Sequence, residues 1–134
     1  MRTIAVATTL IVEDNPSFRG SLREILTARF PQMAVDDVGS GEEALERMES
    51  LRPDLMFVDI RLPGQNGLEL TRQIRKGDTE VTIVILTNYD LPEFREAAYR
   101  YGVNYFFSKS ASTMEEIVAA VEAILRQKVE ARRN

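Results

Sequence analysis

The strongest constraint on the fold of this chain is a short apolar segment that ends at a carboxylate. Residues 55–58 read Leu-Met-Phe-Val, Asp59 follows directly, and Leu62-Pro63-Gly64 then turns the chain. Four consecutive apolar residues without polar alternation predict a strand buried on both faces, as in a parallel sheet. Asp59 would therefore lie at the carboxyl end of a buried strand, the edge where open α/β sheets bind ligands. A single aspartate there could equally serve only to cap the following turn.

Strand patterns alternate with helix patterns along the rest of the chain. The predicted strands cover residues 10–12 (extending back to residue 8 at most), 33–38, 55–58, 81–86 and 105–108. Helices are predicted to begin at Asn15-Pro16, Ser40, Asn66, Asp90-Leu91-Pro92 and Ser112-Thr113. This alternation predicts an α/β fold with right-handed crossovers and a parallel sheet covered on both faces. The second strand is more polar than the others and is expected at a sheet edge.

The composition fits one globular domain and limits its chemistry. The 134 residues carry a net charge of −4, which offers no basic surface for nucleic acid, and no apolar segment reaches membrane-spanning length. We therefore expect a cytoplasmic single domain at residues 1–134, with a core at about 9–129. Residues 130–134 are interpreted as a fraying helix end or as the start of a linker. The chain has no cysteine and no histidine, so its chemistry must use carboxylates, hydroxyls, amines and the backbone.

Polar residues of complementary chemistry follow four of the predicted strands. They are Glu13 with Asp14, Asp59, Thr87 and Lys109. Each alone is an ordinary strand-end or helix-capping residue, but the combination is difficult to attribute to chance. Clustered carboxylates repel one another, and oxygen ligands without histidine or cysteine suit Mg²⁺ or Mn²⁺. With a lysine and a hydroxyl nearby, such a site suits transfer of a phosphoryl group onto a carboxylate.

These motifs resemble the receiver domain of two-component response regulators. The matching segments are 10–15, 54–59, 62–64 and 67–70, together with Thr87 and Lys109. The resemblance implies a flavodoxin-like, doubly wound (βα)5 sandwich with strand order 2-1-3-4-5. It also implies a signalling module that assists its own phosphorylation and dephosphorylation without being an enzyme. Residues 105–110 resemble those of receivers linked to helix-turn-helix regulators and of some single-domain ones.

The resemblance assigns a phosphoacceptor and its metal ligands. Asp59 would accept the phosphoryl group, and Mg²⁺ would be bound by Asp14, Asp59 and the backbone carbonyl of Arg61. Glu13 would act on the metal largely through water. The implied donor is a phosphohistidine on a sensor histidine kinase or a histidine phosphotransfer protein, in keeping with the absence of histidine from this chain.

The resemblance also assigns a switch. Thr87 would bind a phosphoryl oxygen and move on activation, Lys109 would pair with the phosphoryl group, and Phe106 occupies the switch-aromatic position without a tyrosine's hydroxyl. The implied output is a face made by the fourth helix, fifth strand and fifth helix, which would bind a downstream protein or a second copy of the chain. Candidate contacts on the fourth helix are Leu91, Arg95, Tyr99 and Arg100.

Some positions depart from the common pattern of the family. Ser110 stands where a proline usually follows Lys109, which leaves the isomer of that peptide bond open. Asn88 stands where a very small residue usually follows the switch threonine. Asn88, Tyr89 and Arg61 would flank the path of an attacking water, and we expect bulk at Asn88 and Tyr89 to slow hydrolysis of the phosphoryl group. Arg61 could act in either direction, because it could also stabilise the charge of the transition state.

Three alternatives to phosphoacceptor signalling fit the sequence less well. A pseudo-receiver, which keeps the fold and binds partners without phosphorylation, does not require the intact Glu13, Asp14, Asp59, Thr87 and Lys109 set. A flavodoxin-like electron carrier needs a phosphate-binding loop after the first strand, where the acidic pair is electrostatically unfavourable. An aspartate-based phosphatase needs a second acid two residues after the nucleophile, and an arginine occupies that position.

Overall fold

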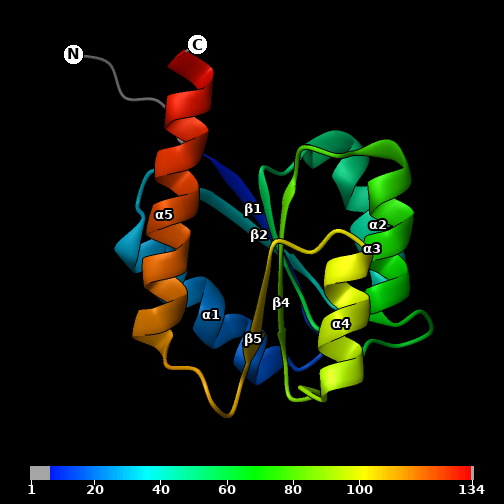
Figure 1. The fold of residues 1–134 in the computed structure, drawn as a ribbon. Helices are drawn as coiled ribbons and strands as arrows, with labels where there is room; N and C mark the ends of the chain where they lie inside the picture. The colour runs from blue at the N-terminus through cyan, green and yellow to red at the C-terminus, as the bar shows by residue number, and fades with distance from the viewer. Residues whose placement is uncertain (1–6, 134) are drawn as a thin grey trace.

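The computed structural model describes residues 7–133 and has the predicted alternation of strands and helices (Figure 1). The strands are β1 (Thr8–Val12), β2 (Ala34–Val38), β3 (Leu55–Val58), β4 (Thr82–Thr87) and β5 (Tyr105–Ser108). The helices are α1 (Pro16–Arg29), α2 (Gly41–Leu51), α3 (Gly67–Gly77), α4 (Pro92–Arg100) and α5 (Met114–Arg133). Over residues 7–133, no helix is long and apolar enough to cross a membrane.

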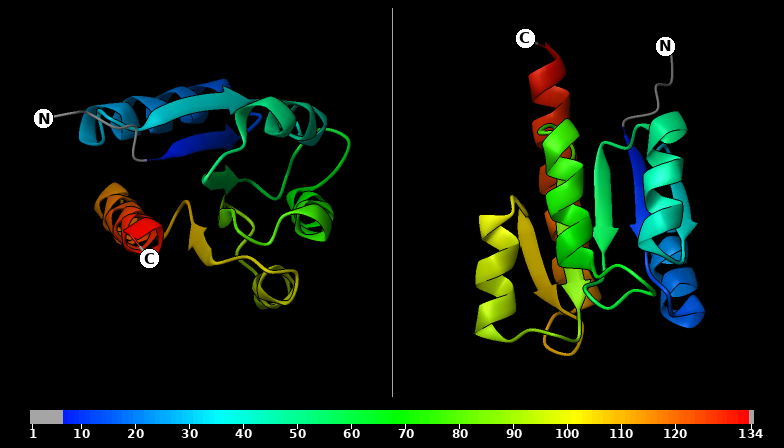
Figure 2. Two further views of the ribbon diagram at one scale, coloured as in Figure 1. Left: turned by 90° about the horizontal axis from the view of Figure 1, so that it is seen from above. Right: turned by 90° about the vertical axis from the view of Figure 1, so that its right-hand side faces the viewer.

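The five strands form one parallel sheet in the order β2-β1-β3-β4-β5. This is the flavodoxin-like doubly wound arrangement, so the predicted fold class and strand order are confirmed. The polar strand β2 lies at an edge, as expected. Helices α1 and α5 cover one face of the sheet, and α2, α3 and α4 cover the other (Figure 2). Because all four strand pairs are parallel, all five strands end at the same edge of the sheet.

The central strands are apolar throughout because helices cover both of their faces. Side chains alternate across a strand, so neighbouring residues of β3 enter different cores. Leu55 and Phe57 pack with residues of α1 and α5, whereas Met56 and Val58 pack with residues of α2, α3 and α4. All four are at most 2% exposed. The segment that most constrained the fold is thus the centre of two cores at once.

Most helices begin where the sequence predicted. The side chains of Asn15, Ser40 and Asn66 each accept a hydrogen bond from a backbone N–H in the first turn of the helix that follows. In α5 the capping residue is Thr113, whose hydroxyl accepts the N–H of Glu116 while the Glu116 carboxylate accepts the N–H of Thr113. This reciprocal pair is a capping box and fixes the start of α5 after the loop that leaves β5.

The end of α5 differs from one of the two sequence interpretations. The helix continues to Arg133, so residues 130–133 do not fray. Nη2 of Arg132 lies 2.7 Å from Oδ1 of Asp54, and Nζ of Lys128 donates to the carbonyl of Glu80 at 3.0 Å. These contacts join residues far apart in sequence, which is why helical periodicity alone did not reveal them. The alternative interpretation, a linker that starts near residue 130, stays a prediction.

Candidate functional site

The carboxyl ends of β1 and β3 bring three acidic residues together. Glu13, Asp14 and Asp59 each offer one carboxylate oxygen, and these oxygens all lie within 4.8 Å of one another. Glu13 and Asp59 are buried at 3% and 7% exposure, whereas Asp14 is exposed. Carboxylates this close repel one another, and burial strengthens the repulsion because less water screens it. The arrangement therefore requires positive charge nearby.

Lys109 supplies part of that charge from the end of β5. Its Nζ lies 2.7 Å from Oε1 of Glu13 and 3.0 Å from Oδ2 of Asp59, and the ring centroid of Phe18 is 4.3 Å away. Burial alone would lower the pKa of Lys109, but hydrogen bonds to both carboxylates outweigh it and raise this pKa. Burial raises the pKa of Glu13, against the opposing effect of the Lys109 hydrogen bond. The ammonium thus bridges the two buried acids in its charged form.

The remaining charge fits a small divalent cation. Three carboxylates and one ammonium leave two net negative charges, and the donors are oxygens only. Such a donor set is the one that Mg²⁺ and Mn²⁺ prefer. The acids open into a pocket of about 260 Å³, so a hydrated ion has an entry path. The pocket is lined by Glu13, Asp14, Asn15, Asp59, Arg61, Asn88, Tyr89 and Lys109.

Arg61 and Tyr89 form a contact across the rim of this pocket. Nη1 of Arg61 donates to the hydroxyl of Tyr89, and the guanidinium carbon stands 5.3 Å from the centre of the tyrosine ring. The backbone N–H of Arg61 also points at Oδ1 of Asp59, over a long 3.4 Å. Asn88 is exposed beside them. The three side chains that the sequence placed around the approach to Asp59 therefore do lie around one pocket with it.

Thr87 and Phe106 lie deeper than the pocket residues. Thr87 is fully buried at the end of β4, and its hydroxyl accepts the N–H of Tyr89 at 3.2 Å, so it is not among the pocket-lining residues. Phe106 is 6% exposed and belongs to the core beneath α4. The guanidinium of Arg95 stands 4.6 Å from its ring centre and donates to its backbone carbonyl at 3.4 Å. Phe106 thus links the end of the sheet to α4.

Known proteins resemble this chain in both sequence and fold. The sequence profile of the response regulator receiver domain matches residues 9–122. Response regulator MprA of Mycobacterium ulcerans is 35% identical over 118 residues, which are 88% of this chain and 50% of that protein. The chain belongs to the receiver domain family. It spans about half the length of this curated relative.

Solved structures agree with this assignment. A two-component response regulator of the LuxR family from Aurantimonas sp. SI85-9A1 has a TM-score of 0.82 and 33% identity, covering 90% of this receiver and 86% of that chain. The BeF3-activated N-terminal receiver domain of Klebsiella pneumoniae RstA has a TM-score of 0.82 and 27% identity, covering 89% of this receiver and 98% of that chain. The similarity extends over nearly all of the present fold.

The loop that follows Lys109 in this receiver is closed by serine side chains. The Lys109–Ser110 peptide is trans, since residues 7–133 contain no cis peptide bond. The Ser108 hydroxyl lies 3.1 Å from that of Ser110 and accepts the N–H of Ala111 at 3.3 Å. The backbone N–H of Ser112 donates to the Ser108 carbonyl at 2.9 Å. These contacts hold the loop compact at the position where the family commonly has proline.

Sequence reasoning missed three residues that shape the site of this receiver. Phe18 has no part in the site predicted from the sequence, yet its ring packs on the Lys109 ammonium. Arg19 went unnoticed, yet its Nη1 donates to the Glu13 carbonyl at 2.7 Å. Gly67 enters the sequence prediction only through the helix start at Asn66 and the matching segment 67–70, yet a Cβ there would lie 2.0 Å from the carbonyl oxygen of Asp59. The contacts of Phe18 and Arg19 depend on the placement of α1, whereas a glycine just after a turn could have signalled a close backbone approach.

Proposed function

We propose that this receiver accepts a phosphoryl group on Asp59 from a phosphohistidine of a sensor histidine kinase or a histidine phosphotransfer protein. The observation that carries the proposal is the meeting of Asp14, Glu13 and Lys109 around Asp59 in one open pocket. A phosphorylation-independent binding module needs no such arrangement of repelling acids, which the fold has to stabilise. The pseudo-receiver alternative therefore explains less of the site.

In the proposed step, a carboxylate oxygen of Asp59 bonds to phosphorus as the P–N bond of the donor breaks. The bonding electrons leave with the imidazole nitrogen, and the product is an acyl phosphate. Lys109, now 3.0 Å from Oδ2 of Asp59, would pair with an incoming phosphoryl oxygen. Thr87 would turn its hydroxyl from the Tyr89 amide toward another phosphoryl oxygen. Charge on the transferred group would thus be met by Lys109, which already lies beside Asp59, and by Thr87 after its hydroxyl turns.

Mg²⁺, or Mn²⁺ in its place, would be held by Asp14, Asp59 and the backbone carbonyl of Arg61. When bound, it would neutralise charge on the phosphoryl oxygens during transfer. Glu13 is engaged with Lys109 at 2.7 Å, so its expected contact with the metal through water would be shared with that ion pair. Asp14 is exposed and offers the first carboxylate that an arriving ion meets.

The phosphoacceptor proposal is tested with a small acyl-phosphate donor and intact-mass measurement. The receiver should gain one phosphate in the presence of Mg²⁺ and none when the metal is chelated. Asp59→Asn should gain none under either condition, while circular dichroism shows that it is folded. A wild-type protein that stays unmodified with donor and metal both present would refute the proposal and favour the pseudo-receiver.

We further propose that the output surface is formed by α4, β5 and α5. Thr87 and Phe106 lie on the neighbouring strands β4 and β5, and Arg95 joins Phe106 to α4, so movement at the site has a direct route to this helix. Leu91 and Tyr99 are 52% and 48% exposed large apolar residues on or beside α4. They are suited to contact a downstream protein or a second copy of the chain.

NMR distinguishes this output surface from the alternatives. Binding of a beryllofluoride phosphoryl mimic should shift backbone signals of α4 and β5 more than those of the last two turns of α1. Shifts confined to the loops around Asp59 would contradict the proposal. Substitution of Tyr99 by alanine should leave the spectrum of the unphosphorylated domain intact and weaken binding to an identified partner.

A further inference from the structure

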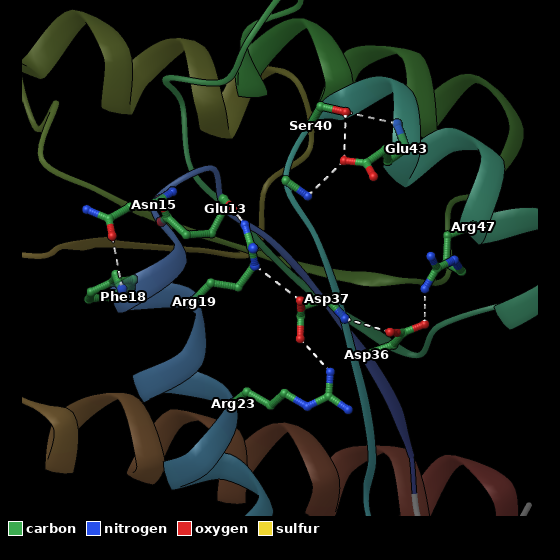
Figure 3. Close-up of polar contacts among 11 residues, drawn as sticks. Glu13, Asn15, Phe18, Arg19, Arg23, Asp36, Asp37, Ser40, Glu43 and Arg47 are labelled. Atoms are coloured by element: carbon green, nitrogen blue, oxygen red, sulfur yellow. Dashed lines mark hydrogen bonds and ion pairs between the residues drawn. The ribbon is translucent and has the colours of Figure 1, made fainter.

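Each polar group of Glu13 makes a hydrogen bond or an ion pair. One of these contacts comes from Arg19, which is drawn with Glu13 in Figure 3. The Glu13 N–H donates to the carbonyl of Val38 at 3.1 Å, and the Glu13 carbonyl accepts from Nη1 of Arg19 at 2.7 Å. Of its carboxylate oxygens, Oε2 accepts the N–H of Asn15 at 3.0 Å and Oε1 pairs with Lys109. The conformation of the turn that carries Glu13 and Asp14 is therefore fixed through both the backbone and the side chain of Glu13.

Arg19 is in turn fixed by the edge strand β2. Its Nε lies 3.1 Å from Oδ1 of Asp37, and the other oxygen of Asp37 pairs with Arg23, one turn further along α1. The side chains of Arg19 and Asp37 are 25% and 22% exposed. A Cβ added to Gly39 would lie only 3.2 Å from Nη1 of Arg19, so the guanidinium fills space that this glycine leaves. Arg19 thus connects α1 and β2 to the turn after β1.

Neither a contribution to folding stability nor the positive charge alone explains why an arginine contacts both Asp37 and the Glu13 carbonyl. A partly exposed ion pair contributes little to folding. A lysine could pair with Asp37, but only the planar guanidinium presents N–H groups at fixed angles to a carboxylate and a peptide carbonyl together. Groups that orient metal ligands commonly alter metal affinity or activity 10- to 100-fold when they are removed. The contact of Arg19 with the Glu13 carbonyl is of this orienting kind.

We propose that Arg19, held by Asp37, is a positioning residue that fixes the Glu13 peptide and so directs the Glu13 and Asp14 carboxylates toward Asp59. The proposal rests on the proposed phosphoacceptor function, because it concerns the same acidic site. It also predicts a change in Mg²⁺ affinity that is opposite in direction to the change expected from simple electrostatics. Removing a positive charge beside an acidic site strengthens cation binding if only charge matters, whereas losing the orientation of the ligands weakens it.

The first test measures Mg²⁺ binding by calorimetry in Arg19→Met, with Arg23→Met as the matched control. Both variants remove one arginine from α1 that pairs with Asp37, but only Arg19 contacts Glu13. Arg19→Met should bind Mg²⁺ roughly 10-fold more weakly than wild type, and Arg23→Met within about twofold. Arg19→Lys keeps the charge and should still bind several-fold more weakly. Tighter or unchanged binding in Arg19→Met would overturn the proposal.

The second test needs no metal. The Asn15 N–H donates to the Glu13 carboxylate at 3.0 Å, so its hydrogen exchange reports the order of the acidic turn. In metal-free protein this amide should exchange faster in Arg19→Met than in Arg23→Met, and equal rates would overturn the proposal. A wild type that binds no Mg²⁺ would refute the proposed function, while the exchange rates would still decide the role of Arg19. If Arg19→Met does not fold, Asp37→Asn, which frees Arg19, should show the same faster exchange.

Discussion

Substitution of Gly67 by alanine should destabilise this receiver although the residue begins a helix. Glycine to alanine in a helix normally stabilises by roughly 0.5–1 kcal/mol, because alanine loses less backbone entropy on folding. At Gly67, however, a Cβ would lie 2.0 Å from the carbonyl oxygen of Asp59 and 2.8 Å from its carbonyl carbon. A carbon and a carbonyl oxygen approach to about 3.3 Å at best, so the two segments must separate by about 1.3 Å.

The size of the effect follows from this separation. Forcing an extra methyl into packed structure costs about 1–3 kcal/mol. The same movement stretches the hydrogen bond from the Gly67 N–H to the Ile60 carbonyl, now 2.7 Å, which contributes about 1 kcal/mol. We therefore expect Gly67→Ala to lower the free energy of unfolding by about 2–4 kcal/mol. Because the displaced segment carries Asp59, phosphorylation should slow as well.

Urea unfolding followed by circular dichroism measures this difference against a matched control. Gly20 lies in α1 with no atom within 4 Å of an added Cβ. Gly20→Ala should therefore raise the free energy of unfolding by about 0.5–1 kcal/mol, the ordinary helix effect. If Gly67→Ala were as stable as wild type, the close approach of Gly67 to Asp59 would not constrain the loop, and the reasoning would fail.

Three further predictions concern stabilisation by Mg²⁺, the loss of stability at acid pH and the lifetime of the phosphoryl group. Mg²⁺ at ten times its Kd should raise the free energy of unfolding by about 1.4 kcal/mol, and Asp14→Asn should lose most of this gain at the same concentration. Burial raises the pKa of Asp36, but the hydrogen bonds from Arg47 and the Asp37 amide, together with the charges of Arg47 and Arg23, outweigh it, so the net pKa is lowered from 3.8. Asp36→Asn should cost about 0.5–1 kcal/mol in urea unfolding at pH 7, a difference that disappears as the pH falls below 3.8 through the folded pKa. Timed phosphate release should be faster in Asn88→Ala and Tyr89→Ala than in wild type, and equal or slower release in both would contradict occlusion of the attacking water.

Much of the fold was predictable because local signals agree with one another. The apolar segment at 55–58 admits few other placements, since four residues without polar alternation must be covered on both faces. Caps at Asn15, Ser40 and Asn66 then fix where helices begin. The continuation of α5 to Arg133 was not predictable, because the pairing of Arg132 with Asp54 joins residues 78 positions apart.

The meeting of Glu13, Asp59 and Lys109 was predictable from the sequence, and their contacts were less so. Parallel strands end at one edge, so Asp59 and Lys109 could be placed together from strand ends alone. The sequence could not show that Lys109 bridges Asp59 and Glu13, because that depends on the depth at which each side chain is buried. Nor could it show the contact between Arg61 and Tyr89, which long flexible side chains make only in one of many rotamer combinations.

The burial of Glu13 changes how the charge balance of the site should be understood. As a residue acting on a metal through water, Glu13 would be expected at the open side of the pocket, as Asp14 is. It is instead 3% exposed, with both carboxylate oxygens engaged by Lys109 and the Asn15 amide. A buried carboxylate is stable only when it is paired and hydrogen-bonded, and Glu13 meets both conditions within the protein. If the Lys109 ammonium turns from Asp59 to a phosphoryl oxygen, Glu13 can therefore keep it charged and anchored throughout the transfer.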